Sequence, residues 1–338
     1  MNKREVKLTL YQAARGLLPY GIIMSHRRRQ TEKRLETLPR TEGPALYNEH
    51  GERLKLFYLS DSALTWQYYS FTRFREPGHI FWDRNNASLK THFYSHGNIR
   101  TLVGNPEKRF AIIVETESID PGSYALLLCN PSLAREFNGI FTHSARLLDR
   151  YSNTRFMPAG GVWYGLPIFG GTMDPSSYLK KSKNVSIVSS NKSMCPLHLL
   201  RIEMAKALKA SGTVDTYGTF DGGRHVKIAE SLTEYRYSII VENSTEPYCF
   251  TEKIMNCFAA MTIPIYVGAS KISEFFNPDG IIVVNEKTAL ADIGEIVKKC
   301  SEEDYMSRKE AILDNYSRVE SYYCQEDYIY AKYGDMLV

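Results

Sequence analysis

Residues able to bind a charged ligand cluster around one apolar segment in the second half of the chain. The run YSIIV, at 237–241, ends in Glu242 and Asn243, and eight positions after Asn243 comes Thr251, followed by Glu252 and Lys253. We expect Thr251 to cap a helix, which places Glu252 and Lys253 in its first turn. The free N–H groups and positive dipole end of a helix N-terminus attract anions, and Lys253 adds a full charge, so the pattern suits a diphosphate. The same pattern is also typical of an ordinary capped helix with solvated charges.

Two carboxylates that are candidates for a general base follow an apolar run at 110–114. Glu115 comes directly after this predicted strand, where partial burial would raise its pKa and help it accept a proton near neutral pH. Glu117, two residues later, would point the same way in a strand and is the second candidate. Solvated acids at a strand edge are the alternative interpretation of both residues.

One arginine is a further candidate for chemistry, whereas the cysteines are not. Arg201 lies in a predicted helix over 197–210, where its planar guanidinium either binds two phosphate oxygens or is a surface charge. The six cysteines form no CxxC pair and no His interleaving at zinc spacing, which predicts buried reduced thiols and no metal site.

The elements that must position these residues alternate between strands and helices. The second half predicts strands at 185–188, 213–217, 238–241, 263–267 and 280–284, with helices at 197–210, 229–235, from 252 and at 272–276. The first half predicts strands at 54–59, 79–82 and 110–114, spaced widely enough for crossover helices. This alternation predicts two α/β units with parallel sheets, in which ligands bind beyond the carboxyl ends of the strands.

The length of the chain and the distribution of its charges predict its domain organisation. A chain of 338 residues exceeds what one core usually serves, so two domains are expected. The net charge of +4 is too small to indicate nucleic acid binding, but residues 1–40 hold ten Lys or Arg against three acids, a net of +7. We predict a basic arm over 1–40, a first α/β domain over 41–170, a second over 171–310, and a helical segment over 311–338 that packs back on the first.

Three motifs carry a resemblance to a known family. The strings ENS (242–244), TEK (251–253) and TIPIYVG (262–268) resemble the donor-binding motif of the α-1,3/4-fucosyltransferases, glycosyltransferase family 10, of the bacterial type. Upstream, VSIVSSNKSMCPLHLLRIEMAKAL followed by VDTYG resembles that family's strand, turn and arginine-bearing helix, and VETESIDP resembles its acidic segment. The similarity is strong over 185–285, moderate over about 99–165, and not visible in residues 1–50 or the last thirty.

The resemblance implies a fold, a reaction and roles for residues. The fold is the α/β GT-B type, with two Rossmann-like domains facing a cleft, and the first domain is then the acceptor side. The reaction is transfer of L-fucose from GDP-fucose with inversion, without a bound metal or other cofactor. Glu115, with Glu117 as second candidate, is implied as the base. Arg201, Asn243, Glu252 and Lys253 are implied as donor-binding residues, with Arg201 and Lys253 neutralising the departing diphosphate.

The sequence departs from the family at the expected donor-sugar pocket. Where the family has Tyr two residues before the Thr of TEK, this chain has Cys249, with Tyr248 beside it as the candidate donor-binding residue. Two alternatives therefore stay open: a transferase of the same fold using another nucleotide-linked deoxysugar, and a non-catalytic glycan- or nucleotide-binding protein. Retention of Glu115 together with the implied donor-binding residues argues against the second.

The basic arm and the absence of long apolar runs predict where the protein acts. No secretory core and no membrane-spanning run occur, so we expect a cytoplasmic protein, peripheral at the inner face of the membrane, acting on a lipid-linked or lipopolysaccharide oligosaccharide. Val6, Leu10, Ala14, Leu17 and Leu18 recur at helical spacing. Such a helix, followed by the basic patch at 27–29, either lies on an anionic membrane surface or packs its apolar stripe on the first domain.

Overall fold

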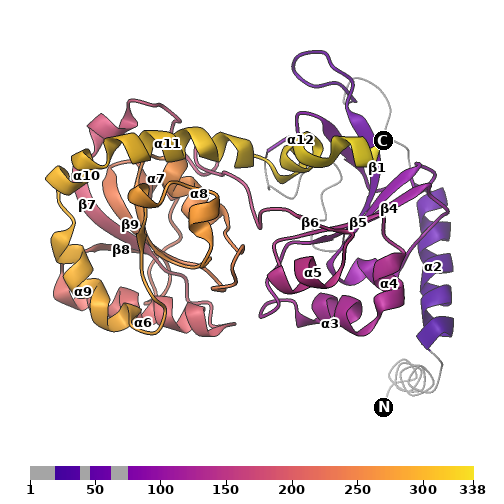
Figure 1. Ribbon diagram of the computed structural model, residues 1–338, viewed down its shortest axis with the longest axis horizontal. Coiled ribbons are helices and arrows are strands. Elements are labelled where there is room, and N and C mark those ends of the chain that lie inside the picture. The colour runs from indigo at the N-terminus through magenta and orange to yellow at the C-terminus, as the bar shows by residue number, and fades with distance from the viewer. Residues whose placement is uncertain (1–19, 39–45, 62–74) are drawn as a thin grey trace.

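Two separate parallel sheets organise the molecule (Figure 1). The computed structural model describes residues 20–38, 46–61 and 75–338. The predicted helix over Val6–Leu18 lies outside these residues.

The first sheet has six strands in the order β2-β1-β3-β4-β5-β6. The strands are β1 (Lys55–Ser60), β2 (Ile80–Asp83), β3 (Thr91–Ser95), β4 (Lys108–Ile113), β5 (Gly139–Thr142) and β6 (Thr154–Phe156). Every pairing is parallel, and alternate side chains of the central strands are buried on opposite faces. On β4, Ala111 and Ile113 join one core, whereas Phe110 and Ile112 join the other. Burial on both faces requires helices on both sides of the sheet.

Helices from both ends of the chain provide this cover. One face is covered by α2 (Tyr20–Glu36), α3 (Pro121–Cys129), α4 (Pro131–Arg135) and α5 (Ala145–Arg150), and the short 3₁₀ helix η2 (His96–Arg100) lies nearby. The other face is covered by the C-terminal helix α12 (Gln325–Leu337), which inserts Ile329 and Leu337 against the sheet. The basic patch at 27–29, predicted to follow the N-terminal helix, lies within α2, and Leu35 anchors this helix in the core.

The second sheet has five strands in the order β11-β10-β9-β7-β8. The strands are β7 (Lys183–Val188), β8 (Asp215–Tyr217), β9 (Tyr235–Val241), β10 (Ile263–Val267) and β11 (Ile282–Val283). The helices around it are α6 (Pro196–Ser211), α7 (Ile228–Leu232), α8 (Glu252–Ala259), α9 (Ala289–Lys299), α10 (Glu302–Ser307) and α11 (Lys309–Val319). The predicted helix at 272–276 is only a 3₁₀ turn, η4 (Ile272–Glu274); other such turns are η3 (Ser177–Lys180), η5 (Pro278–Gly280) and η6 (Glu320–Tyr322).

Both sheets share one topology. Renumbered within each domain, the order is 2-1-3-4-5, with a sixth strand added in the first domain. In such doubly wound sheets the chain reverses direction between the first and third strands, and the crevice at their carboxyl ends is the usual ligand site. In the second domain this crevice lies between β7 and β9. The fold confirms the predicted α/β, GT-B-like class of two Rossmann-like domains.

The chain crosses between the domains twice. The first crossing follows β6, and the second precedes α12. Both crossings are hydrogen-bonded to their surroundings. In the first crossing, Ala159 N–H donates to Phe250 O at 3.2 Å, and Val162 N–H donates to Tyr323 O of the second crossing at 3.2 Å. A Cβ on Gly160 would lie 2.8 Å from the backbone nitrogen of Glu252, so only glycine permits this approach to the start of α8. The first crossing therefore forms part of the site described next.

Candidate functional site

A cavity of about 580 Å³ lies between the two domains at the crevice between β7 and β9. Its walls come from the loop after β4, from the first crossing, and from the polar ends of β7, β9, α6 and α8. The lining residues from these segments include Glu115, Thr116, Gly160, Gly161, Trp163, Ser190, His198, Arg201, Asn243, Thr251, Glu252 and Lys253. Five of the predicted site residues, Glu115, Arg201, Asn243, Glu252 and Lys253, therefore meet in one cavity although they come from both domains.

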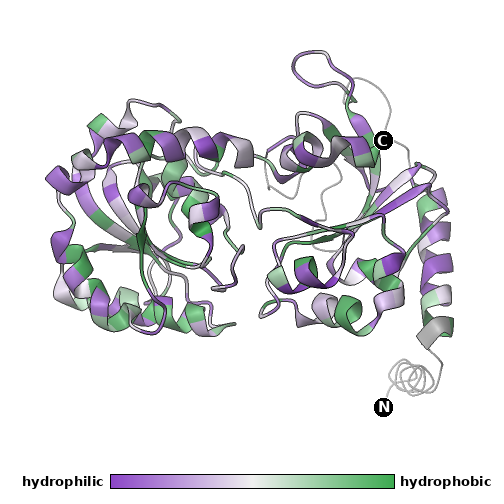
Figure 2. Ribbon diagram, in the orientation of Figure 1, coloured by the Kyte–Doolittle hydropathy of each residue, from purple (hydrophilic) through white to green (hydrophobic). Residues whose placement is uncertain are grey.

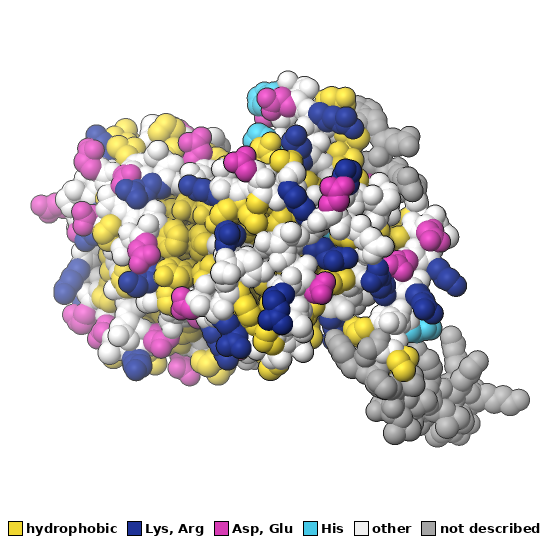
Figure 3. Space-filling view, turned by 45° about the vertical axis from the view of Figure 1, so that its right-hand side comes forward, with side chains coloured by type: hydrophobic (Ala, Val, Ile, Leu, Met, Phe, Trp, Pro, Cys, Tyr) yellow, Lys and Arg dark blue, Asp and Glu magenta, His cyan; other side chains and the backbone are white. Residues whose placement is uncertain are grey.

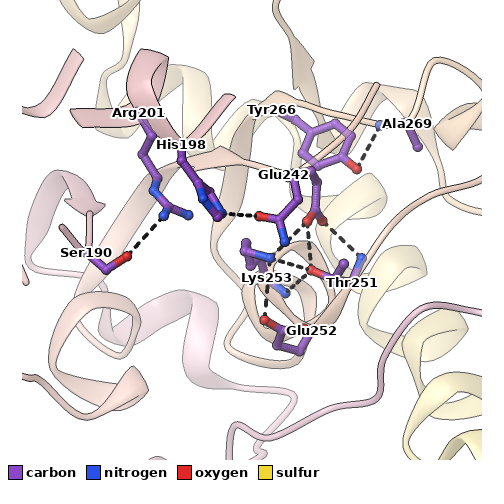
Figure 4. A network of polar contacts seen from close by, with 10 residues as sticks. Ser190, His198, Arg201, Glu242, Thr251, Glu252, Lys253, Tyr266 and Ala269 are labelled. Carbon is purple, nitrogen blue, oxygen red and sulfur yellow. Dashed lines mark hydrogen bonds and ion pairs between the residues drawn. The ribbon is translucent and has the colours of Figure 1, made fainter. Parts of the chain in front are cut away.

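A buried carboxylate ties the end of β9 to the start of α8 (Figure 4). Glu242 is 0% exposed; its Oε1 accepts from Thr251 N–H at 3.0 Å, and its Oε2 accepts from Thr251 Oγ1 at 2.7 Å and from Lys253 Nζ at 3.2 Å. Thr251 Oγ1 in turn accepts from Lys253 N–H at 3.3 Å, which confirms the predicted N-cap. Glu242 thus holds the N-terminus of α8 in place beneath the cavity.

Lys253 remains a cation in this setting. Burial lowers the pKa of Lys253, but the carboxylates of Glu242 and Glu252 outweigh burial and raise it above the usual lysine value. The Nζ atom of Lys253 lies 3.5 Å from Glu252 Oε1, and both side chains line the cavity. A ligand therefore meets a fixed positive charge beside the positive end of a helix.

Arg201 is a buried cation of the cavity that has no carboxylate in direct contact among the described residues. Its side chain is buried, Nη2 donates to Ser190 Oγ at 3.2 Å, and burial lowers its pKa. Among the described residues, no hydrogen-bond partner reaches its Nε and no carboxylate lies within ion-pairing distance of its guanidinium. A buried guanidinium left in this state is costly unless an anion binds to it. Arg201 therefore indicates an anion site facing Lys253.

The two candidate bases separate in the structure. Glu115 lines the cavity, whereas Glu117 pairs with Arg146 at 2.8 Å and is not among the lining residues. The prediction that both point the same way is wrong, because β4 ends at Ile113 and the alternation of a strand no longer applies. The expected partial burial of Glu115 is also wrong, since its side chain is exposed.

The backbone on which Glu115 sits is fixed by two buried side chains. Tyr124 OH donates to the carbonyl of Glu115 at 2.9 Å, and His143 Nε2 donates to the carbonyl of Val114 at 2.9 Å. Burial lowers the pKa of His143 to about 4, so the ring is neutral at physiological pH. These two bonds hold the loop after β4 at the rim of the cavity.

Tyr248 does not join the site. Its ring packs edge-on against Phe156 and Phe275, with centroid distances of 6.3 and 6.2 Å, and it does not line the cavity. Its neighbour Cys249 is fully buried, and burial raises the pKa of the thiol, so the sulfur stays protonated. Neither residue supplies the hydroxyl that the family's tyrosine would place here.

A second, mostly apolar cavity of about 250 Å³ adjoins the first. It shares Trp163, Ser190, Arg201, Glu252 and Lys253 with the first cavity and continues between the side chains of Val188, Val226, Ile228 and Ile240. In the space-filling view, hydrophobic side chains gather on this domain with Lys and Arg around them (Figure 3). An apolar slot beside an anion site has the form required by a nucleoside diphosphate.

Several residues of the site were not predicted from the sequence, among them Gly160, Trp163, Ser190 and His198. The GG pair at 160–161 was the only signal of a close backbone approach, because serine, histidine and tryptophan occur both in cores and on surfaces. Trp163 is held by its backbone, whose N–H donates to Asn256 Oδ1 of α8 at 2.8 Å. No group of three or more metal-ligating side chains occurs in the described ranges.

The chain is similar to known proteins over the part that supplies the second-domain wall of the cavity, including Arg201 and Lys253. Residues 178–311 match glycosyltransferase family 10 (fucosyltransferase) C-term. A segment of 158 residues is 27% identical to 3-galactosyl-N-acetylglucosaminide 4-alpha-L-fucosyltransferase FUT3 of Bos taurus, covering 45% of this chain and 41% of that protein. The same protein of Pan troglodytes is 27% identical over 167 residues, covering 45% and 43%. The chain thus matches about two fifths of the length of these curated relatives.

The solved structures that match this chain have lower sequence identity to it than the curated relatives have. A crystal structure of alpha1,3-fucosyltransferase covers 84% of this chain and 87% of its own at 16% identity and a TM-score of 0.47. A crystal structure of alpha1,3-fucosyltransferase with GDP covers 88% and 96% at 13% identity and a TM-score of 0.45.

Proposed function

We propose that this chain, whose residues 178–311 match the C-terminal model of glycosyltransferase family 10, transfers L-fucose from GDP-fucose to a hydroxyl group of a glycan, with inversion. The single observation that carries this proposal is Arg201, a buried guanidinium with no described carboxylate in contact, facing Lys253 at the N-terminus of α8. Two fixed cations beside an apolar slot fit the diphosphate and the nucleoside of a sugar nucleotide.

In the proposed reaction the two domains contribute different groups to the cavity. Inversion requires the acceptor hydroxyl to attack the sugar on the face opposite the diphosphate, so the base must lie across the cavity from the cations. Glu115 belongs to the first domain, whereas Arg201 and Lys253 belong to the second. In our proposal Glu115 takes the hydroxyl proton while the two cations stabilise the negative charge on the leaving diphosphate.

We expect this reaction to need no metal, because Arg201 and Lys253 supply the charge that a divalent cation supplies elsewhere. Transfer should persist after exhaustive treatment with EDTA, with at most a modest loss. The measurement is product formation in metal-depleted buffer, with and without added Mg²⁺ or Mn²⁺. Complete inactivation that added metal reverses would contradict the roles given to these two residues.

A thermal-shift panel tests the proposed donor. GDP and GDP-fucose should stabilise the protein more than UDP, CMP or dTDP compounds at equal concentration. A ligand present at a hundred times its Kd raises the free energy of unfolding by about 2.7 kcal/mol, so a weaker ligand gives a smaller shift. A clear preference for a nucleotide without guanine would overturn the donor assignment. Stabilisation by nucleotides without any transfer would favour the non-catalytic alternative.

One observation favours a second candidate with a different sugar. Tyr248 packs among aromatic rings and Cys249 is fully buried, so neither of these two residues brings a tyrosine hydroxyl into the cavity lining. Another nucleotide-linked deoxysugar is the corresponding donor. Turnover of GDP-fucose and of other nucleotide-linked deoxysugars, compared in one assay, distinguishes the two candidates.

We further propose that α2 holds the enzyme at an anionic membrane surface, where a lipid-linked or lipopolysaccharide acceptor is available on the cytoplasmic side. The helix is largely hydrophilic (Figure 2), and its Arg29, Lys33 and Arg34 side chains are exposed. Each basic residue near anionic lipid contributes about 1 kcal/mol. Among the described helices, none has the length and apolarity needed to cross a bilayer.

Vesicle sedimentation tests this attachment. The full chain should bind phosphatidylglycerol vesicles more than phosphatidylcholine vesicles, and added salt should weaken the binding because exposed charges are screened beyond about 8 Å at physiological ionic strength. Replacing Arg29, Lys33 and Arg34 by Gln should reduce the binding while leaving Leu35 in the core. Equal binding by the triple variant and the original chain would remove α2 from the proposal.

A further inference from the structure

His198 connects two walls of the cavity. It lies in the first turn of α6, its side chain is 4% exposed, and it lines the cavity. Its Nδ1 accepts from the backbone N–H of Met194 at 3.2 Å, and its Nε2 lies 2.9 Å from Oδ1 of Asn243, which follows β9. The ring therefore bridges the loop after β7 and the loop after β9.

These two contacts determine the protonation state of the ring. A backbone N–H can only donate, so Nδ1 must carry a lone pair and the single proton must be on Nε2. Burial lowers the pKa of His198, as do the cations Arg201, Lys253 and Lys192, which outweigh the opposing effect of the bond to Asn243. The neutral ring with its proton on Nε2 agrees with both hydrogen bonds.

The proton on Nε2 in turn determines the orientation of the Asn243 amide. A donor on His198 requires the oxygen of the amide on its side, which turns the NH₂ group of Asn243 away from the ring. Among the described residues, no acceptor binds this NH₂ group. Asn243 also lines the cavity that holds Arg201 and Lys253, so its amide adds a neutral hydrogen-bond donor beside these two cations.

The opposite orientation would harm anion binding. With the amide flipped, the carbonyl oxygen of Asn243 would face the cavity and repel phosphate oxygens, and it would compete for the donors of the two cations. We propose that His198 is a positioning residue that selects the donor-presenting orientation of Asn243 and thereby raises the affinity for a diphosphate. This inference rests on the proposed function, since it assumes that the cavity binds the diphosphate of a sugar nucleotide.

Two substitutions separate this role from simple anchoring of the loop. In His198→Gln, the amide nitrogen replaces Nε2 and can still donate to Asn243. In His198→Asn, the amide oxygen replaces Nδ1 and can still accept from Met194, but the side chain is too short to reach Asn243. We expect His198→Gln to bind GDP within about twofold of the original chain, and His198→Asn to bind it about fivefold more weakly, the loss of one hydrogen bond.

A double-mutant cycle with Asn243→Ala completes the test, with the Kd of GDP and of inorganic pyrophosphate measured by calorimetry. If His198 acts through Asn243, His198→Asn causes no further loss in the Asn243→Ala background. Losses that add in that background, or equal losses in the Gln and Asn variants, would overturn the inference. Pyrophosphate carries the diphosphate group without a nucleoside. If the original chain binds pyrophosphate but prefers a nucleotide without guanine in the thermal-shift panel, the donor assignment is overturned, and the role of His198 can still be measured with pyrophosphate. No binding of either probe by the original chain would overturn both.

Discussion

Replacing Glu115 by Gln is expected to lower kcat by ~10²- to 10⁴-fold, the usual range for the loss of a general base. The substitution keeps the shape of the side chain and removes its ability to accept a proton. Donor affinity should change little, because Glu115 belongs to the wall opposite Arg201 and Lys253. Steady-state kinetics with saturating donor, together with the Kd of GDP, provide the measurement.

Glu117→Gln is the matched control for this prediction. Glu117 lies two residues away and pairs with Arg146 at 2.8 Å, outside the cavity lining. Both side chains of this pair are solvent-accessible, so breaking it should cost at most about 1 kcal/mol of stability and leave kcat close to normal. Near-normal turnover in Glu115→Gln combined with an inactive Glu117→Gln variant would move the base two residues along the loop.

Replacing Lys253 by Met is expected to have two separate effects. It removes a cation from the anion site, which should weaken GDP binding by more than about tenfold, since charge-assisted hydrogen bonds contribute about 1.5–3 kcal/mol. It also leaves Glu242 buried without its ion-pair partner, which should lower the free energy of unfolding by about 3 kcal/mol. Denaturant unfolding and calorimetry measure the two effects independently.

The double variant Lys253→Met with Glu242→Gln separates binding from folding. The neutral amide introduced by Glu242→Gln removes the uncompensated charge, and its oxygen can still accept from the N–H of Thr251. We therefore expect stability to recover largely in the double variant, while GDP binding stays weak. Recovery of GDP affinity along with stability would show that Lys253 acts on the fold of the site and not on the ligand.

Much of the second domain followed from the sequence by itself. Its strands are buried runs of apolar residues between turn signals, and such runs depend on local composition: β10 was predicted with the bounds it has in the structure, Ile263–Val267. The cap at Thr251 was predictable for the same reason, since it depends on residues within two positions of one another. Most of the motifs that carry the family resemblance also lie in this domain, within the matched range 178–311, whereas VETESIDP (114–121) lies in the first domain.

The first domain was harder to predict because its buried strands carry polar residues. Three strands, β3, β5 and β6, had no signal strong enough to be expected. In β3 the fully buried His92 is tolerated because its Nδ1 hydrogen-bonds to Tyr94 OH at 2.9 Å, a contact that no pattern of hydropathy records. The short strand β6 becomes a strand only by pairing with β5.

By itself, the sequence determined the fold class of two parallel α/β domains and the set of residue types gathered for an anionic ligand. The tertiary structure alone decided which of them face the ligand: Glu115 and not Glu117, because β4 ends early, and not Tyr248, because its ring finds aromatic partners. It also brought Gly160 against the start of α8 and His198 against Asn243. These choices depend on loop conformations and on contacts between residues far apart in the chain, 45 positions in the His198–Asn243 pair, and such contacts leave no periodic signal in the sequence.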